Sequence, residues 1–284
     1  CPVDIGNADY SERLREEISL AGLSFPTHNQ VLENIKMTKN PFGDTSKKQI
    51  KEGNEVVYYR GCMALYREKN IADSTIKLLE KLNVSYALID EVCCGSVALR
   101  TGNKKIVKEL AKENLEKIKK TGAKTVIFSC AGCLRAFMKD YPDLNDANLE
   151  FLHSSQYFLQ KIKEGKLKLK DGRKLKVTFH DPCHMGRHLK IYEEPRDVLK
   201  RLPTIEFVEI NNSKENSRCC GAGGGVKSIF GELSVSMAKE RINDARDVGA
   251  KIIVSTCPFC KRNLNDSLEM EVIDLSELLL EYSI

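Results

Sequence analysis

Ten of the eleven cysteines in this 284-residue chain occur in two copies of one pattern. Each copy has a lone cysteine, then an adjacent pair followed by glycine, then two cysteines separated by two residues. The first copy comprises Cys62, Cys93, Cys94, Cys130 and Cys133, and the second comprises Cys183, Cys219, Cys220, Cys257 and Cys260. Because thiolates bind zinc and iron–sulfur clusters, the repeat predicts two related metal centres.

The spacing within each copy favours a multi-iron cluster over a single ion. Two thiols in Cys-x-x-Cys at the start of a helix can bind one body, and the helix N-terminus favours the thiolate form. Adjacent cysteine side chains diverge, which suits a larger cluster, and we expect Gly95 and Gly221 to let the backbone approach it closely. Five thiolates exceed the four ligands of a closed zinc site. There are two alternatives. Four of the five cysteines in a copy could bind zinc, or the cysteines could have a purely structural or disulfide role.

The cysteine count is odd and the first residues do not resemble a signal peptide, so we expect a reducing, cytoplasmic compartment. No apolar run approaches the roughly 18 residues that cross a bilayer. The net charge is +5, and the densest basic stretch, residues 161–176, is interpreted as a solvated linker. We therefore expect no nucleic-acid partner.

The flanks of the cysteines also repeat, since Ala111–Cys130 is similar to Ala238–Cys257. Each cysteine group is expected just beyond a short strand, and helices are expected at 68–82 and 104–120, the latter ending at Gly122. The expected strands are 56–59, 84–89, 125–128, 175–179, 205–210 and 252–254. This alternation predicts an α/β fold with two pseudo-repeated parallel-sheet βα modules and a helical N-terminal arm. The expected units are 1–53 (the arm), 54–165 and 166–284, with the cysteines at the carboxyl ends of the strands.

Several other polar residues lie beside the second cysteine set. His184 directly follows Cys183, where it could supply a proton or hydrogen-bond a cluster sulfide. His180 and His188 are expected to orient the loop, and Arg187 to meet a substrate anion or form a surface ion pair. The glycine-rich run 221–225 does not match Gly-x-Gly-x-x-Gly. We interpret it as allowing close backbone approach to a cluster or substrate.

At these motifs the sequence resembles the CCG, or cysteine-rich, domain family over about residues 56–284. The segments Asp181-Pro-Cys-His-Met-Gly-Arg-His188, Arg218-Cys-Cys-Gly-Ala-Gly-Gly-Gly225 and Asn40-Pro-Phe-Gly43 are similar to the D, or catalytic, type of heterodisulfide reductase. The resemblance implies two facing non-cubane 4Fe–4S clusters, each held by the five cysteines of one copy. A coenzyme M–coenzyme B disulfide would enter between them and be reduced to two thiols.

The resemblance also implies partners and a setting. The electrons would come from a redox protein, either a membrane cytochrome b or a flavin or ferredoxin protein, and the former would associate the chain with a membrane. The setting implied is anaerobic methanogenesis. Cys1-Pro2 is similar to the end of a ferredoxin motif. Cys1 is therefore expected to complete a cubane 4Fe–4S cluster with an upstream ferredoxin-like segment.

Two other functions remain open from the sequence. One is an iron–sulfur electron-transfer subunit of a flavin-dependent dehydrogenase of the glycolate, lactate, glycerol-3-phosphate or thiol:fumarate type. The other is a zinc-stabilised assembly module, which predicts zinc in place of iron. Disulfide reduction by the isolated chain distinguishes the catalytic function from the electron relay.

Overall fold

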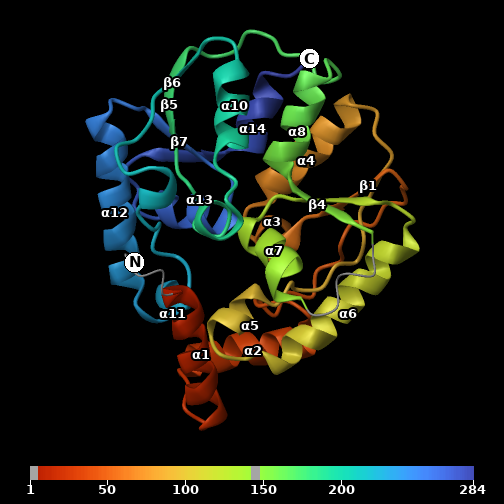
Figure 1. The fold of residues 1–284 in the computed structure, drawn as a ribbon, viewed down its shortest axis with the longest axis vertical. Helices are drawn as coiled ribbons and strands as arrows, with labels where there is room; N and C mark the ends of the chain where they lie inside the picture. Colours follow the sequence, from red (N-terminus) through yellow and green to blue (C-terminus); the bar gives the residue numbers. More distant parts are fainter. Residues whose placement is uncertain (1–5, 142–147) are drawn as a thin grey trace.

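A computed structural model describes residues 6–141 and 148–284 and contains two parallel four-stranded sheets. The first sheet has the order β2-β1-β3-β4 and the second the corresponding order β6-β5-β7-β8 (Figure 1). The strands are β1 (Val56–Tyr59), β2 (Tyr86–Ala87), β3 (Thr125–Phe128), β4 (Glu150–His153), β5 (Leu175–Phe179), β6 (Ile205–Phe207), β7 (Ile252–Ser255) and β8 (Glu271–Asp274). The α/β fold with two repeated parallel-sheet modules is confirmed.

The central strands are rich in β-branched and aromatic residues because both of their faces are covered. All four residues of β1 and of β7 are buried, as expected for parallel strands between helical layers. Val57 and Tyr59 pack in one hydrophobic core, whereas Val56 and Tyr58 point into the other. The two-residue period of a strand thus separates two cores.

Each sheet belongs to one half of the molecule, residues 54–165 or 166–284. Four helices form the layer between the two sheets, and each packs against a helix of the other half (Figure 1). Helix α4 (Lys69–Lys81) packs against α14 (Leu275–Glu281), and α8 (Ser154–Lys163) packs against α10 (Glu193–Arg201). In chain order α4 corresponds to α10, and α8 corresponds to α14. The two contacts are therefore equivalent, which gives the molecule an internal pseudo-two-fold arrangement.

Two long helices, α6 (Lys105–Lys120) and α12 (Gly231–Asp247), lie on opposite sides of the molecule (Figure 1). Helix α6 buries Val107, Leu110 and Ile118 on one face, which is the pattern that predicts it from sequence. It ends where expected, because Gly122 adopts a φ of 77°, a left-handed conformation that glycine accepts at a helix end.

The N-terminal arm is helical in its described part, as expected. It comprises α1 (Asn7–Leu20) and α2 (Pro26–Thr38), followed by a turn at residues 41–43. Asn40 stabilises this turn, since its side-chain oxygen accepts hydrogen bonds from the backbone N–H groups of Phe42 and Asp44. The remaining short helices are α3 (Gly61–Tyr66), α5 (Ser96–Arg100), α7 (Ala131–Arg135), the π-helix η1 (Ala136–Asp140), α9 (Gly186–Leu189), the 3₁₀-helix η3 (Lys214–Asn216), α11 (Val226–Ile229) and α13 (Pro258–Asn265).

The sheet edges differ from the sequence prediction. Strands β2 and β6 are shorter than the expected 84–89 and 205–210, because each lies at an edge and pairs with a single neighbouring strand. Strands β4 and β8 were not predicted. Each has only four residues and starts with an exposed glutamate, so its apolar run is too short to indicate a strand.

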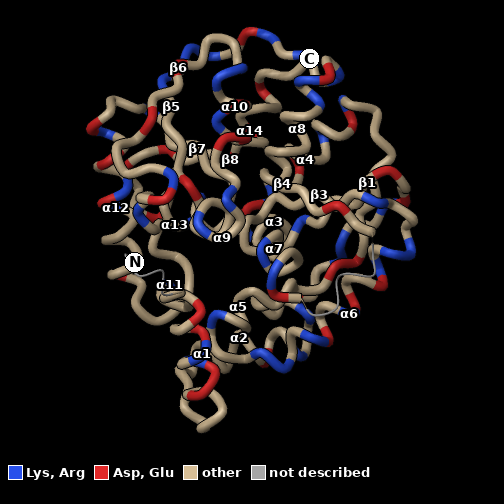
Figure 2. The backbone as a smooth tube through the Cα atoms, viewed as in Figure 1, with Lys and Arg blue, Asp and Glu red and all other residues tan. Residues whose placement is uncertain are grey.

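Charged residues of both signs are interspersed over the halves and the arm (Figure 2). The basic stretch 161–176 runs from the end of α8 through an irregular connection into β5. Several of its cations are paired, for example Lys166 with Glu164 at 2.9 Å and Arg173 with Glu281 at 2.7 Å. Within residues 6–141 and 148–284, no helix combines the length and apolar character needed to cross a bilayer.

Equivalent residues, His153 and Asp274, end the last strand of each sheet and cap the helix that follows. The His153 Nδ1 atom accepts from the Ser155 N–H, and the Asp274 Oδ1 atom accepts from the Ser276 N–H. The other His153 nitrogen bonds the Thr256 carbonyl at 2.9 Å across the halves, whereas Asp274 Oδ2 is buried with no partner among the described residues. Burial raises the pKa of Asp274 to about 7.

We expect the Asp274→Asn substitution to stabilise the protein at alkaline pH. The pKa in the folded state is about 7 and the ordinary value is 3.8, so the stability that Asp274 contributes below pH 4 is lost as pH rises through 7. This difference corresponds to roughly 4 kcal/mol at most. Urea denaturation at pH 5 and pH 8, at equal iron content, measures it.

The variant and wild type should converge near pH 4 and separate toward pH 8. The exposed Glu271 in the same strand provides the control, since Glu271→Gln should leave the pH dependence unchanged. Parallel pH curves for wild type and Asp274→Asn would contradict the assignment.

Candidate metal centres

All ten cysteines of the two copies lie beyond the carboxyl ends of strands, as predicted. Cys130 is the N-cap residue of α7 and Cys257 that of α13, so each Cys-x-x-Cys pair opens a helix. The backbone N–H groups of Cys133 and Gly132 add to the interaction with the Cys133 side chain in lowering the pKa of Cys130. These backbone donors favour the thiolate form at the first position of the motif. Cys1 lies outside the described residues.

Neighbouring cysteine side chains of both copies influence one another's protonation, and these interactions link them in one continuous series. The series runs Cys62, Cys93, Cys94, Cys133, Cys130, Cys257, Cys260, Cys220, Cys219 and Cys183. All ten are free thiols. Cys130 and Cys257, which are equivalent in the two copies, make the contact at its middle. The two sets therefore adjoin each other across the pseudo-two-fold axis.

One sulfur in each half acts as the acceptor of its neighbours' S–H groups. Hydrogen bonds from Cys133 and Cys257 hold the pKa of Cys130 well below its usual range. Hydrogen bonds from Cys183 and Cys220 do the same for the pKa of Cys219. The donors show the opposite change, so the pKa of Cys133 and of Cys257 is raised, chiefly by the bond to Cys130.

This donor set fits iron–sulfur clusters. Thiolates crowded in one buried place repel each other, and a multi-iron body removes that repulsion because ligation requires the deprotonated form. Cys62, Cys183 and Cys219 are half-buried, and the other seven sulfur-bearing residues are buried. A ring nitrogen of His180 also lies with the Cys220 and Cys260 sulfurs, all three within 4.8 Å of one another.

Buried ion pairs hold the loops that carry the lone cysteines. In the first half, the Arg60 guanidinium donates to both carboxylate oxygens of Glu91, at 2.9 and 2.7 Å. Arg60 stands two residues before Cys62, and Glu91 stands two residues before Cys93. This pair therefore ties the lone-cysteine loop to the Cys-Cys loop.

In the second half a buried ion pair also holds the lone-cysteine loop, but the residue before the lone cysteine is the acid and its partner is the base. Asp181, two residues before Cys183, receives two hydrogen bonds from Arg196 of α10, at 2.7 and 2.9 Å. It also accepts from the backbone of Lys214 at 2.8 Å. Arg187 donates to the carbonyl groups of Glu215 and Ser217. It thus supports the segment before Cys219, and among the described residues it has no carboxylate partner.

Gly95 and Gly221 have a packing role that the sequence did not predict. Both have positive φ values, 78° and 89°. A side chain at Gly95 would meet Val107 of α6, and one at Gly221 would come within 2.5 Å of the Ser234 carbonyl oxygen in α12. These glycines therefore allow the Cys-Cys-Gly turn to pack against a long helix.

His184 crosses to the first half. A Cβ atom at Gly132, inside the first Cys-x-x-Cys turn, would lie 3.3 Å from His184 Nδ1. Its ring also contacts His188 edge-on, at 5.4 Å between centroids. Burial, together with the charges of Arg100 and Arg135, lowers the pKa of His184 to about 3.

The arm contacts the same region, which the sequence did not predict. Glu12 of α1 pairs with Arg100 at 3.0 Å and with Arg135 at 3.4 Å. His28 of α2 lies 3.4 Å from the Gly225 carbonyl oxygen in the glycine-rich run. No local pattern could indicate these contacts, because they join residues more than 80 positions apart.

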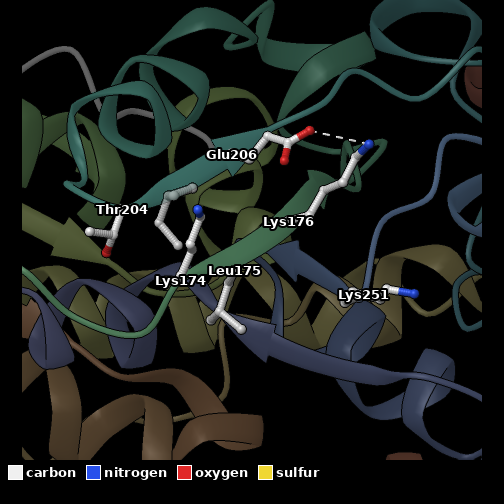
Figure 3. Close-up of a pocket in the computed structure, with 7 residues that line it drawn as sticks. Lys174, Leu175, Lys176, Thr204, Glu206 and Lys251 are labelled. Carbon is white, nitrogen blue, oxygen red and sulfur yellow. Dashed lines mark ion pairs between the residues drawn. The ribbon is translucent and has the colours of Figure 1, made fainter.

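A cavity of about 450 Å³ lies elsewhere, at the amino-terminal ends of the second sheet's strands (Figure 3). It is lined by Lys174, Leu175, Lys176, Thr204, Ile205, Glu206 and Lys251. Lys176 and Glu206 form an ion pair across it at 3.2 Å. Its lining includes neither cysteine nor histidine, so it is separate from the sulfur cluster.

The profile of the cysteine-rich (CCG) domain matches residues 56–138 and 177–265. The chain is 41% identical over 245 residues to the D subunit of the dihydromethanophenazine:CoB–CoM heterodisulfide reductase of Methanosarcina barkeri, covering 82% of this chain and 60% of that protein. It is 31% identical over 293 residues to the B subunit of the fumarate reductase (CoM/CoB) of Methanothermobacter marburgensis, covering 98% of this chain and 58% of that protein.

Among solved structures, a hypothetical protein from Helicobacter pylori superposes with a TM-score of 0.62 at 11% identity, covering 89% of this chain and 53% of that chain. This is a similarity of fold alone. The chain spans about 60% of the length of the two curated relatives. Their names and the cysteine-rich domain support iron–sulfur cofactors and an oxidoreductase subunit. The chain belongs to the cysteine-rich (CCG) domain family, of which it carries two copies.

Proposed function

We propose that this chain is the iron–sulfur catalytic subunit of a heterodisulfide reductase that converts the disulfide of coenzyme M and coenzyme B into two thiols. In this proposal residues 54–165 and 166–284 each bind one non-cubane 4Fe–4S cluster through their five cysteines. The arm, residues 1–53, continues a ferredoxin-like segment in which Cys1 completes a cubane cluster.

The observation that carries the proposal is the unbroken series of interactions between cysteine side chains through both copies, joined by Cys130 and Cys257. A disulfide bond has two sulfur atoms, and two adjoining centres provide one centre for each sulfur atom. Both copies are complete, which favours a pair that acts together on one substrate. Relatedness to the D subunit of a heterodisulfide reductase supports the same reaction.

The reaction needs two electrons and two protons. The clusters, when bound, would provide the two electrons for cleavage of the S–S bond. An electron-donating redox protein, of the cytochrome b, flavin or ferredoxin class, would restore these two electrons. The S–S bond breaks, and each sulfur gains one electron and one proton. The residues of this chain hold the two centres next to each other and exclude water from the seven buried sulfurs.

His184 is the proposed proton shuttle. It belongs to the second half, yet it lies against the Cys130–Cys133 turn of the first. A neutral imidazole can accept a proton at one ring nitrogen and release one from the other. The contacting ring of His188, which is half-buried, continues the path toward the surface.

One test is thiol formation by the anaerobic chain with a reduced viologen as electron donor. We expect turnover of the coenzyme M–coenzyme B disulfide. The His184→Met variant, which copies Met63 of the first half, should turn over roughly a hundredfold more slowly at equal iron content.

A second candidate function is electron relay to a partner that carries the substrate chemistry, and the relation to the B subunit of a fumarate reductase favours it. In that case the viologen would reduce the clusters without thiol release. If iron-replete protein accepts electrons but forms no thiols, the result would contradict the catalytic proposal and support the electron relay.

A further inference from the structure

The two halves differ at one equivalent pair of buried positions behind the cysteines. Tyr59 and His180 each stand three residues before the lone cysteine, and Asn114 and Arg241 occupy equivalent places in α6 and α12. The pairing repeats in space, since Asn114 Nδ2 lies 3.4 Å from the Tyr59 hydroxyl and Arg241 Nε lies 3.2 Å from His180 Nδ1. The first half thus has a neutral pair where the second has a cation and an imidazole.

In the first half, Tyr59 and Asn114 form hydrogen bonds with the backbone of Val92. The Tyr59 hydroxyl donates to the Val92 carbonyl oxygen at 2.5 Å. Asn114 accepts from the Val92 N–H at 3.0 Å and donates toward the Tyr141 hydroxyl at 3.3 Å. Tyr59 therefore donates its proton to a carbonyl, and it has none left for the sulfurs of Cys94 and Cys133.

In the second half, a fully buried guanidinium fixes the imidazole. Arg241 is 0% exposed and donates to His180 Nδ1, to the Asn212 carbonyl at 2.6 Å and to Asp244 at 3.3 Å. An arginine N–H can only donate, so His180 Nδ1 carries no hydrogen and the ring proton is on Nε2. His180 is thereby prepared as a hydrogen-bond donor through Nε2.

The sulfurs of Cys220 and Cys260 are within 4.8 Å of a ring nitrogen of His180. Hydrogen bonds to cluster sulfurs and nearby positive charge raise the reduction potential of an iron–sulfur cluster, because they stabilise the more negative reduced form. A ring N–H that can donate and a buried guanidinium both stand behind the second cysteine set.

Other buried charges near the two sets are offset by partners. Arg60 is paired with Glu91, and Asp181 with Arg196. Arg100 and Arg135 share Glu12 and Asp140. Arg241 is likewise paired with Asp244, which also contacts Arg218, and Arg218 pairs in turn with Glu240. What distinguishes the second set is that a cation and an imidazole stand where the first set has an amide and a phenol.

We propose that Arg241 and His180 give the second centre the higher reduction potential, so that electrons from the donor occupy it before the first. Arg241 is a positioning residue that acts through His180, and His180 donates to a thiolate of the second centre. The inference rests on the ligand sets proposed above but not on the identity of the disulfide.

The test is a redox titration of the anaerobic, iron-replete protein, followed by visible absorption and electron paramagnetic resonance. Arg241→Asn, which copies Asn114, should lower one of the two potentials by at least a tenfold change in the reduced-to-oxidised ratio, which is 59 mV for one electron. Cys94→Ala protein, expected to keep only the second centre, identifies which potential moves. Lys239→Asn removes a half-exposed cation from the same helix and should move neither potential.

His180→Phe provides an independent reading, because it keeps a buried ring and Arg241 but removes the donor. It should also lower the potential of the second centre alone. If Arg241→Asn fails to retain iron, the His180→Phe result decides. Unchanged potentials in iron-replete His180→Phe protein, or equal shifts of both centres, would overturn the inference and leave the proposed function intact. Absence of iron from the wild-type protein would overturn both.

Discussion

Replacing Cys94 by alanine is expected to remove about half of the bound iron and acid-labile sulfide, and replacing Cys220 is expected to do the same. Cys94 contacts both Cys93 and Cys133, and Cys220 contacts both Cys219 and Cys260. Each is thus the link between the Cys-Cys pair and the Cys-x-x-Cys pair of its own half. Its loss divides one ligand set without altering the other.

The measurement is iron, zinc and acid-labile sulfide per chain after anaerobic preparation. The double variant should lose nearly all iron, while Ser96→Ala, beside the first motif but without sulfur, should retain the wild-type amount. About one zinc per half with little sulfide would exclude the cluster assignment and favour a zinc-stabilised module. Complete iron loss from either single variant would show that the halves do not assemble independent centres.

Replacing Glu91 by alanine is expected to destabilise the fold by about 3–5 kcal/mol, because it leaves the Arg60 charge buried without its partner. The side chains of Arg60 and Glu91 are only 3% and 1% exposed. This is a large part of a typical stability of about 5–15 kcal/mol. Since the pair joins the loops of Cys62 and Cys93, the variant should also lose iron from the first centre.

Urea denaturation of metal-free protein separates the stability effect from cluster binding. The adjacent Asp90 serves as the matched control: its pair with Lys48 is 55% exposed on the aspartate side, so Asp90→Ala should change stability by less than about 1 kcal/mol. The double replacement Arg60→Met with Glu91→Leu should recover most of the loss, because it leaves no buried charge. Similar effects of Glu91→Ala and Asp90→Ala would argue against a structural role for the buried pair.

Local features of the fold were readable in the sequence because they depend on neighbouring residues. The apolar run at 56–59 and the helical periodicity of 105–120 with Gly122 at its end reproduce the elements of the structure. The strands β4 and β8 were missed, since four residues beginning with glutamate form a strand only when a sheet edge is there to pair with them. The packing of Gly95 against Val107 was not predicted, because the two residues are 12 positions apart.

The sequence by itself determined the duplication, the ten cysteines and their grouping, because the identity and spacing of ligands are properties of the chain. Only the tertiary structure decided that both sets adjoin through Cys130 and Cys257, that His184 lies against the opposite half, and that Arg241 stands behind one set and Asn114 behind the other. These arrangements depend on how two similar halves pack through α4, α14, α8 and α10. Contacts between residues so distant in sequence leave no local pattern, so packing alone places them.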